Sequence, residues 1–297
     1  MAKKQFRPML AVPVDLNKLR YPVYISPKLD GIRAVVMKAQ LISRTLKPIP
    51  NDLIRDFFSD RLELEGIDGE LIVGCPTAKD VFQRSTSGVM TKTGEPNFRF
   101  YVFDVVSAGR FGFSERLSWL RELESAKRIT VVPQWFALNL SELQRQHTNH
   151  IYQGYEGSII RSVDGFYKFG RSTVNEGYLL KWKPMEDAEA VVKGFEEKMH
   201  NGNGPQKDER GYTKRSSHKS GKVPTGTLGA LLVQSPEWPK EFSIGSGFTD
   251  SQRSDIWHNK ALYLGSSVKF KFQRSGTKDV PRVPTFLGFR SSLDISA

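Results

Sequence analysis

The segment KLDGIR, residues 28–33, places an amine, a carboxylate and a guanidinium around one glycine, between two strand-like runs. Residues 21–25 and 32–37 are rich in β-branched, aromatic and aliphatic side chains, which is strand composition. Asp30-Gly31 predicts a tight turn between them. A lysine amine is mostly protonated at neutral pH, so Lys28 could act as a nucleophile only where cationic neighbours or a metal favour its neutral form. The segment therefore predicts either a nucleophilic lysine or an ordinary hairpin with a solvated lysine.

Composition indicates a soluble intracellular protein with room for two domains. The chain has 297 residues, of which 38% are hydrophobic and 26% charged. Residues 1–6 lack an apolar signal segment, and no run approaches the ~18 apolar residues of a membrane span. Cys75 is the only cysteine, which excludes intrachain disulfides and zinc ribbons and fits a reducing compartment.

The net charge of +12 predicts a polyanionic partner. Residues 187–297 hold 17 basic and 12 acidic side chains, and residues 198–222 alone hold seven basic and two acidic ones. The excess charge of the second part of the chain therefore lies in one segment. Such a segment is either a solvated loop or an element that tracks phosphates.

The first 186 residues alternate strand-like and helix-like patterns. Asn51 is a plausible N-cap for a helix whose apolar residues recur at helical spacing. Lys181 and Lys183 are expected on one face of a strand, because strand side chains alternate with period two. Further strands are expected at 41–45, 66–73, 97–106, 130–135, 155–161 and 177–184, and helices at 51–61, 77–84, 114–127 and 141–153.

After a hinge at residues 182–186 the pattern becomes strand-rich. Strands are expected at 187–199, 225–234, 241–245 and 267–274, with one helix at 250–260. This density predicts a small barrel of the oligonucleotide-binding (OB) type. The expected domains are residues 1–186 and 187–297, with a basic insertion at about 201–222.

The order of short motifs along the chain resembles the covalent nucleotidyltransferases. KLDGIR is similar to their nucleophile motif KxDGxR, and SRT (43–45), DGEL (68–71), YVFD (101–104), EGSI (156–159) and LLKWKP (179–184) resemble the motifs that follow. GYTKRSSHKSGKV (211–223), FSIGSGF (242–248) and PRVP (281–284) narrow the resemblance to the minimal ATP-dependent DNA ligases typified by the Chlorella virus enzyme. The resemblance implies an α+β fold: a nucleotidyltransferase domain of antiparallel sheets with flanking helices, followed by an OB-fold β-barrel.

The resemblance also implies a mechanism. Lys28 would attack the α-phosphorus of ATP, expel pyrophosphate and hold AMP as a phosphoramidate. Lys181 and Lys183 would favour the neutral Lys28 amine and bind the α-phosphate. Asp30 would lie near the 3′-hydroxyl of a nick during sealing.

Other side chains are implied to hold the nucleotide and a metal. Mg²⁺, for which Mn²⁺ would substitute, is expected near Glu156, with Glu70 or waters as further ligands. Glu70 and Arg33 would otherwise contact the ribose hydroxyls, and Phe103 would stack on adenine. Arg44 would grip the AMP phosphate or the 5′-phosphate of the nick.

The last motif contributes two arginines that are implied to orient the pyrophosphate leaving group, Arg282 and Arg290. Two departures from the family pattern occur here. Val283 stands where the family usually has an aromatic residue, and residues 290–294 do not match the RxDK of larger ligases. The role of Arg290 is therefore less well supported than that of Arg282.

The implied partner is nicked duplex DNA, bound by a monomer in the cytoplasm or nucleoid of a cell or of a virus-infected host, in DNA replication, repair or recombination. Residues 201–222 are too polar to pack and are expected to be largely disordered in the free protein. The resemblance implies that they form a hairpin that closes around the duplex. The side chains available for phosphates are Arg44, Lys207, Arg210, Lys214, Arg215, Lys219 and Lys222.

Four other classes of protein share part of this pattern or its basic charge. An RNA-capping guanylyltransferase would share the lysine motif and the barrel but use GTP, and residues 211–223 would have no purpose. An RNA ligase usually lacks this barrel. An NAD-dependent DNA ligase is not expected, because only 27 residues precede Lys28 and one cysteine cannot build a zinc module. A non-catalytic nucleic-acid-binding module would not need the set of carboxylates.

Overall fold

The structure is a computed structural model that describes residues 6–123, 127–273 and 279–290. The chain forms two compact units, and the second begins at Pro184. Each unit has its own sheets and its own buried core. Helices in the described ranges are all too short or too polar to cross a membrane.

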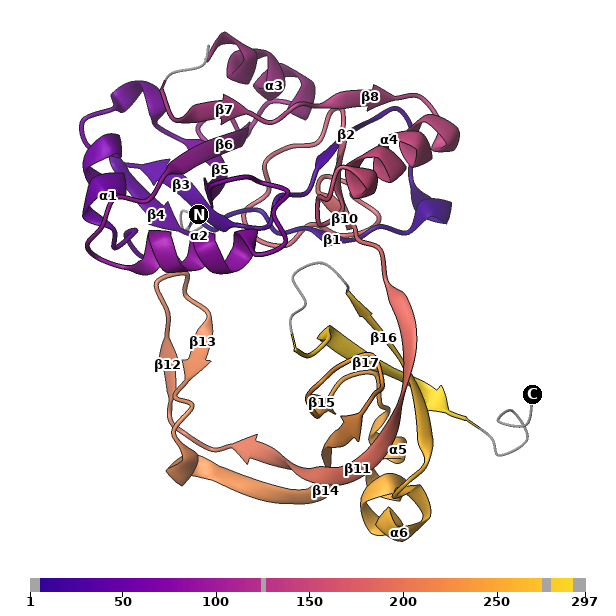
Figure 1. Ribbon diagram of the computed structural model, residues 1–297. Helices are drawn as coiled ribbons and strands as arrows, with labels where there is room; N and C mark the ends of the chain where they lie inside the picture. Colours follow the sequence, from indigo (N-terminus) through magenta and orange to yellow (C-terminus); the bar gives the residue numbers. More distant parts are fainter. Residues whose placement is uncertain (1–5, 124–126, 274–278, 291–297) are drawn as a thin grey trace. The chain divides into compact units, whose positions relative to one another are not determined.

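The first unit is built on two five-stranded sheets with four helices (Figure 1). Its strands are β1 (Val12–Pro13), β2 (Val23–Pro27), β3 (Ile32–Met37), β4 (Gln40–Ser43), β5 (Ile67–Val73), β6 (Phe98–Val105), β7 (Ile129–Val131), β8 (Trp135–Ala137), β9 (Ser158–Ser162) and β10 (Leu180–Trp182). Its helices are α1 (Asp52–Phe58), α2 (Val81–Met90), α3 (Phe113–Glu122) and α4 (Leu140–Tyr152), with 3-10 turns η1 (Leu16–Lys18) and η2 (Leu62–Leu64).

The strand orders are β1-β10-β9-β2-β8 in one sheet and β4-β3-β5-β6-β7 in the other. Neighbouring strands are antiparallel except for β1 with β10 and β6 with β7, which are parallel. Helix α4 packs on β2 and β8, whereas α1, α2 and α3 pack on strands of the second sheet. The predicted α+β class is confirmed, with a parallel strand at one edge of each antiparallel sheet.

Helix α1 shows how local sequence determines an element. The Asn51 side chain accepts a hydrogen bond from the Ile54 amide at 3.0 Å, so the predicted N-cap is confirmed. Ile54 and Phe58 are fully buried against Phe98 and Phe100 of the second sheet. The helix ends at Phe58, three residues before the predicted end, because Ser59 is extended.

The KLDGIR segment is not a hairpin turn, because β2 and β3 belong to different sheets. Residues 28–31 instead cross from one sheet to the other. A Cβ atom on Gly31 would lie 2.4 Å from the Leu71 carbonyl oxygen and 2.5 Å from Ile72 Cδ1. The glycine is therefore needed for close approach to β5, and the predicted tight turn between paired strands is wrong.

Two other predicted elements differ in the structure. Residues 130–135 form the ends of two strands in different sheets, β7 and β8, separated by Pro133, which has no amide hydrogen for a ladder. The helix predicted at 77–84 begins at Val81 and runs to Met90. Its buried face is Val81, Ser85 and Val89, and the serine and glycine content of this stretch hid the helical period.

The second unit is a curled five-stranded sheet in the order β15-β14-β11-β16-β17. Among the described residues, its edge strands β15 and β17 are joined by the isolated bridge between Ser246 and Thr285 rather than by a ladder, so the predicted barrel is not closed by a full ladder. Phe242, Phe270 and Trp238 lie in its core. The bounds are β11 (Glu186–Asn201), β14 (Lys222–Gln234), β15 (Phe242–Ile244), β16 (Ser267–Gln273), β17 (Arg282–Phe289), α5 (Asp250–His258) and α6 (Lys260–Tyr263).

The basic segment, which connects β11 to β14 in the sequence, forms a smaller sheet of its own. Strands β12 (Pro205–Lys207) and β13 (Thr213–Arg215) pair antiparallel, followed by the 3-10 turn η3 (Lys219–Gly221). The side-chain amide of Asn203 donates to the Ser216 and His218 carbonyls at 2.9 and 3.0 Å, and Asn201 also donates to Ser216 at 2.9 Å. Where the sequence predicts disorder, the structure has a hairpin, because asparagine side chains satisfy its backbone without a hydrophobic core.

Candidate active site

Three sequence motifs meet through their backbones at Lys28. The Lys28 amide donates to the Gly157 carbonyl at 2.9 Å. Gly157 has φ +156°, and a Cβ there would lie 2.3 Å from the Trp182 carbonyl oxygen. The glycine of the EGSI motif therefore lets the KLDGIR and LLKWKP segments both approach the backbone at Gly157, next to Glu156.

Glu156 binds two of the predicted lysines. Its side chain is almost fully buried, and one carboxylate oxygen accepts from Lys28 Nζ while the other accepts from Lys183 Nζ. Burial acts to raise the pKa of Glu156, but the charges of Lys28 and Lys183 outweigh it, so the pKa lies below its ordinary value. An ionised carboxylate thus holds both amines.

Lys181 lies close to the same two amines. Its pKa is lowered, first by partial burial and then by the positive charges of Lys183 and Lys28. Arg171, which the sequence reasoning missed, adds to the same effect. Lys28 from the β2–β3 connection, Lys181 of β10 and Lys183 directly after it are therefore brought together in one cationic cluster.

Glu70 faces the KLDGIR segment from β5. Its Oε1 accepts from the Gly31 amide at 3.2 Å. Burial raises its pKa to about 7, although Lys28 and Arg33 act to lower it. Asp30 is near enough for its charge to contribute to the raised pKa. The structure thus places both predicted carboxylates, Asp30 and Glu70, beside the nucleophile candidate.

Arg33 is held differently from the expectation. Its Nε and one Nη donate to the two Asp68 oxygens at 3.0 and 2.5 Å, and the other Nη donates to the Met9 carbonyl at 2.5 Å. Burial acts to lower the pKa of Arg33, but Asp68 outweighs it and raises the pKa. The guanidinium carbon lies 5.4 Å from the centre of the Phe103 ring. Arg33 is therefore an internal ion-pair partner beside the predicted base-stacking residue, and a contact with ribose stays a prediction.

Phe103 is half-buried, beside a buried cluster that includes Leu29, Ile72 and Val132. Arg161 lies 5.6 Å from its ring centre and is almost fully buried. The partly exposed ring leaves surface for a planar ligand. Arg44 follows β4 and is exposed, and its amide donates to the Arg33 carbonyl at 3.2 Å. Its backbone is therefore tied to the strand that leaves the KLDGIR segment.

Residues 8–183 match the ATP dependent DNA ligase domain family. The chain belongs to the ATP-dependent DNA ligase family. Residues 220–290 match the DNA ligase OB-like domain, which identifies the curled second unit. The family match accounts for the order of the motifs around Lys28 and confirms the predicted resemblance.

Solved ligase structures resemble the whole chain of this ligase-family protein. The Chlorella virus DNA ligase-adenylate is 34% identical, with a TM-score of 0.54 over 96% of this chain and 99% of the other. A Lig E DNA ligase is 27% identical, with a TM-score of 0.70 over the same shares.

Among curated relatives, the DNA ligase of African swine fever virus (isolate Tick/South Africa/Pretoriuskop Pr4/1996) is 29% identical over 132 residues, which is 42% of this chain. The match covers 30% of that relative's length. The viral DNA ligase therefore supports the family assignment over these 132 matched residues.

The two arginines of the last motif occupy β17 and its end. Arg282 begins the strand and is half-buried. Arg290 donates from Nε to Glu189 Oε1 at 2.6 Å, on the neighbouring part of the same unit. This ion pair holds Arg290 within the second unit, and contact of either arginine with a nucleotide stays a prediction.

The carboxylates of this ligase-family site fit a weakly held Mg²⁺. Among the described residues, no three His, Cys, Asp or Glu side chains cluster as a metal cage. Glu156 supplies one buried carboxylate whose present partners are two cations, and Glu70 faces a backbone amide. Since Mg²⁺ keeps much of its water shell and binds substrate phosphates, one protein carboxylate is a sufficient donor set.

A buried cluster of charged side chains next to Phe103 was not predicted from the sequence. Asp104 accepts from Arg116 Nε at 2.6 Å and from an Arg161 Nη at 2.5 Å, and all three side chains are almost fully buried. Burial acts to raise the pKa of Asp104, but the two arginines outweigh it and lower the pKa. The YVFD and EGSIIR segments carried the signal, because charged residues within apolar strands are buried only when paired.

A histidine cluster beside β10, the strand that carries Lys181, was also not predicted from the sequence. His147 stacks on Trp182 with ring centres 3.9 Å apart. The Nδ1 atoms of His147 and His150 lie 2.9 and 2.8 Å from the Ser158 hydroxyl oxygen. One hydroxyl has one proton, so one imidazole must donate to Ser158 while the other accepts from it. The spacing His147-x-x-His150 on one helix face was the available signal.

This cluster predicts acid sensitivity. Burial lowers the pKa of both His147 and His150 to about 4, below the ordinary value of 6.5. The folded state therefore keeps both imidazoles neutral. Their contribution to the free energy of unfolding is fully present above pH 6.5 and is lost as the pH falls towards 4. Each proton taken up on unfolding contributes up to ~1.4 kcal/mol per pH unit in that window.

Thermal melts of wild type and of H147Q/H150Q between pH 4 and 7.5 measure this contribution. The double variant is expected to lose melting temperature less steeply than wild type as pH falls. His258, which is exposed on α5, provides the matched control H258Q, which should follow wild type. Parallel curves for wild type and the double variant would contradict the assignment.

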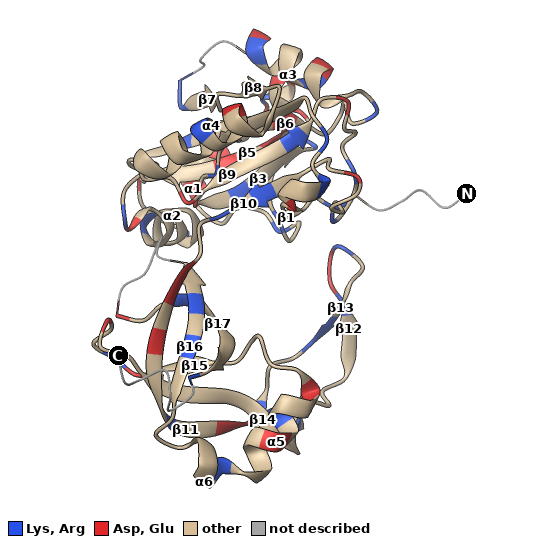
Figure 2. Ribbon diagram, turned by 90° about the vertical axis from the view of Figure 1, so that its right-hand side faces the viewer, with Lys and Arg blue, Asp and Glu red and all other residues tan. Residues whose placement is uncertain are grey.

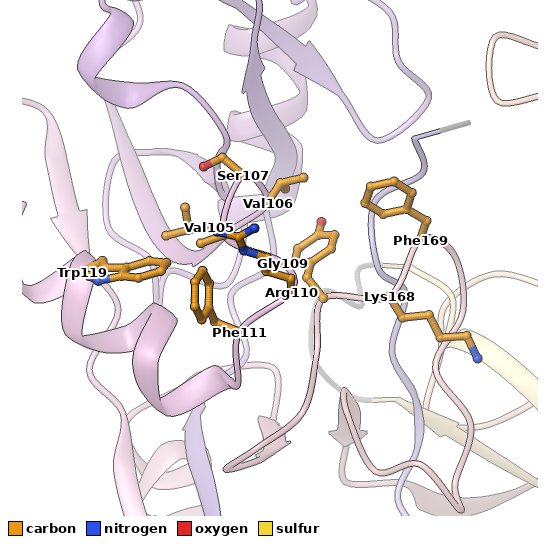
Figure 3. A pocket seen from close by; sticks show the side chains of 11 residues that line it. Val105, Val106, Ser107, Gly109, Arg110, Phe111, Trp119, Lys168 and Phe169 are labelled. Carbon is orange, nitrogen blue, oxygen red and sulfur yellow. The ribbon is translucent and has the colours of Figure 1, made fainter. Parts of the chain in front are cut away.

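One pocket of about 750 Å³ lies between the segment after β6 and residues 167–169 (Figure 3). Phe111 and Trp119 form one side, with ring centres 5.0 Å apart, and Phe169 and Lys168 lie on the other. Lys168 Nζ contacts both Glu176 oxygens at 2.7 and 2.8 Å. Tyr167 lines this pocket with its ring and reaches Asp68 with its hydroxyl.

Proposed function

We propose that the protein seals nicks between a 3′-hydroxyl and a 5′-phosphate in duplex DNA, using ATP. The observation that carries this proposal is the Glu156 carboxylate bound to both Lys28 and Lys183, with Lys181 beside them. A nucleophilic amine, two further cations and a fixing carboxylate are the groups that phosphoryl transfer to lysine requires.

The reaction has three displacements at phosphorus. The Lys28 amine loses a proton and attacks the α-phosphorus of ATP, so a P–N bond forms and pyrophosphate leaves. The 5′-phosphate of the nick then attacks the same phosphorus, breaking the P–N bond and returning the amine. Finally the 3′-hydroxyl attacks the 5′-phosphate, forming the phosphodiester and releasing AMP.

Each neighbouring side chain has a defined task in this scheme. Glu156 positions the Lys28 amine, and Lys181 and Lys183 stabilise negative charge on the α-phosphate. Phe103 offers a ring face for adenine, and Arg44 a fork for a phosphate. Bound Mg²⁺, with Glu156 as the first candidate ligand, would supply charge neutralisation at the phosphates.

Labelling tests the proposal directly. The protein is incubated with Mg²⁺ and radiolabelled ATP, GTP or NAD, each labelled in the nucleotide that would transfer, and then denatured. ATP alone is expected to leave an acid-labile label. Labelling by GTP instead would favour a capping guanylyltransferase, and nicked DNA against nicked RNA substrates separates a DNA ligase from an RNA ligase.

We also propose that residues 201–222 clamp duplex DNA. The six predicted phosphate contacts in this segment are exposed or half-exposed, and Figure 2 shows Lys and Arg positions on β13. Lys207 and Arg215 share one face of the hairpin and Lys214 lies on the other, because β12 and β13 pair in register.

Replacing residues 202–221 by Asn-Gly is expected to flatten the salt dependence of DNA binding. The ladder between β11 and β14 continues to Asn201 and Lys222, so a two-residue turn can close it. If about four lysines and arginines contact phosphates, the slope of log K against log salt should fall by roughly 3 to 4. Labelling by ATP should persist, since the nucleotide-site residues are all retained.

Binding of nicked and intact duplexes distinguishes a clamp from a solvated loop. A clamp that engages the nick should lose more affinity for nicked DNA when the segment is replaced. The variant K207Q/K214Q/K219Q keeps the hairpin and removes three charges, so it should give an intermediate slope. Equal losses of affinity for the nicked and the intact duplex would contradict the clamp proposal.

A further inference from the structure

The Tyr167 hydroxyl completes a closed ring of hydrogen bonds in which Arg33 is one member. It donates to Asp68 Oδ2 at 2.6 Å and accepts from the Met9 amide at 3.2 Å. Arg33 donates to the same Asp68 oxygen at 2.5 Å and to the Met9 carbonyl at 2.5 Å. The ring therefore runs from Tyr167 to Asp68, Arg33 and Met9 and returns to Tyr167.

The donor directions in this ring are mutually consistent. The hydroxyl has one proton, which goes to the carboxylate, and its oxygen accepts from the amide. Burial and the Asp68 charge hold the pKa of Tyr167 well above its ordinary value, so the hydroxyl keeps its proton. Tyr167 and Met9 are buried, which shields these hydrogen bonds from water.

We propose that Tyr167 is a positioning residue that fixes the Arg33 guanidinium against Phe103. Asp68 binds Arg33 through two nitrogens, but Asp68 itself is oriented by the tyrosine hydroxyl. Met9 brings the segment before β1 into the same arrangement. The proposal rests on the proposed function, because Arg33 and Phe103 belong to the candidate adenylate site.

Removing the hydroxyl takes a hydrogen-bond partner from three groups. In Y167F the Met9 amide loses its acceptor, and Asp68 Oδ2 loses the tyrosine donor and keeps only Arg33 of the two. One Arg33 Nη also loses an acceptor that lies 3.4 Å away. Buried polar groups without partners shift to find others, which would move the guanidinium. Displacement of such a group by about 1 Å can cost up to ~10²-fold in rate. We expect kcat/KM for adenylylation by ATP to fall about 10- to 100-fold in Y167F.

The matched control is Y21F. Tyr21 carries a buried hydroxyl in the same unit, with no hydrogen-bond partner in the described structure. Its removal is expected to leave adenylylation within about 2-fold of wild type. Thermal melts of both variants show whether each is folded before rates are compared. Introducing p-aminophenylalanine at position 167 keeps a donor towards Asp68 and should recover part of the lost rate.

A double-mutant cycle separates positioning from general packing. If Tyr167 acts through Arg33, Y167F should cost less than about 2-fold when it is added to R33K. A purely structural role would lower the rate by the same factor in both backgrounds, which would overturn the inference. Adenylylation of Y167F equal to wild type would overturn it as well. Absence of ATP labelling in wild type would instead refute the proposed function.

Discussion

Replacing Lys28 with alanine is expected to abolish labelling of the protein by ATP. The loss should reach at least ~10⁴-fold, because the change removes the nucleophile and with it the covalent route. Sealing of an ordinary nick should be lost in parallel. The measurement is the acid-labile radioactivity that remains on denatured protein after incubation with α-labelled ATP and Mg²⁺.

Two controls restrict the interpretation. K28A should still seal a nick whose 5′-phosphate already carries AMP, because that step needs no lysine adduct. Lys18 is an exposed lysine of the same unit, and K18A should be labelled like wild type. An acid-labile AMP adduct on K28A would show that another residue is the nucleophile. Failure of K28A on the adenylylated nick would point to a folding defect, which a melt would reveal.

Replacing Arg282 with alanine is expected to separate the chemical steps. Arg282 belongs to the second unit and Lys28 to the first, so Arg282 can contact ATP only in an arrangement that the two units adopt for adenylylation. Loss of one preorganised donor at a site where negative charge develops costs about 10²- to 10³-fold in rate. R282A should show this loss in labelling by ATP and yet seal a nick that already carries AMP.

Two further variants of the second unit calibrate that result. Arg290 stands where the sequence departs from the family motif, so R290A should lower adenylylation by a smaller factor than R282A. Lys240 is exposed and pairs with Asp279 at the surface, and K240A should behave as wild type in both assays. Equal losses of R282A in adenylylation and in sealing would place Arg282 in DNA binding or in folding.

The Glu156 carboxylate explains why Lys28, Lys181 and Lys183 can share one site. Three amines in a partly buried site would repel one another, and the ionised carboxylate offsets that repulsion for two of them. In the proposed reaction, the nucleotide would therefore meet Lys28 in a position already defined by protein groups. Preorganisation of this kind is a large source of rate acceleration in phosphoryl transfer.

Local sequence was sufficient for elements whose signals lie within a few residues. The Asn51 cap, the apolar face of α1, and most strands of both units follow from period and capping. The motif order also pointed to Glu70, Lys181 and Lys28 as members of one site, and in the structure Glu70 lies beside Gly31 and Lys181 near Lys28, while their roles stay predictions. These features are short-range, or they belong to a pattern that the whole family shares.

Long-range pairing decided the rest. Residues 28–31 read as a hairpin turn because local composition cannot show that β2 and β3 join different sheets. Pro133 likewise separates two strands of different sheets within one apolar run. Strand partners are chosen by packing over the whole unit, and a turn signal of two residues carries no information about it.

The sequence by itself determined the family, the nucleophile candidate and the charges around it, since these depend on residue types in a given order. Only the tertiary structure showed that Arg33 is bound by Asp68, that Tyr167 and Met9 close a ring around it, and that Asp104 pairs with two buried arginines. Those partners are separated by up to 158 residues, as for Met9 and Tyr167. A buried charge must find a partner to offset its lost hydration, but which partner it finds is set by the packing of strands from distant parts of the chain.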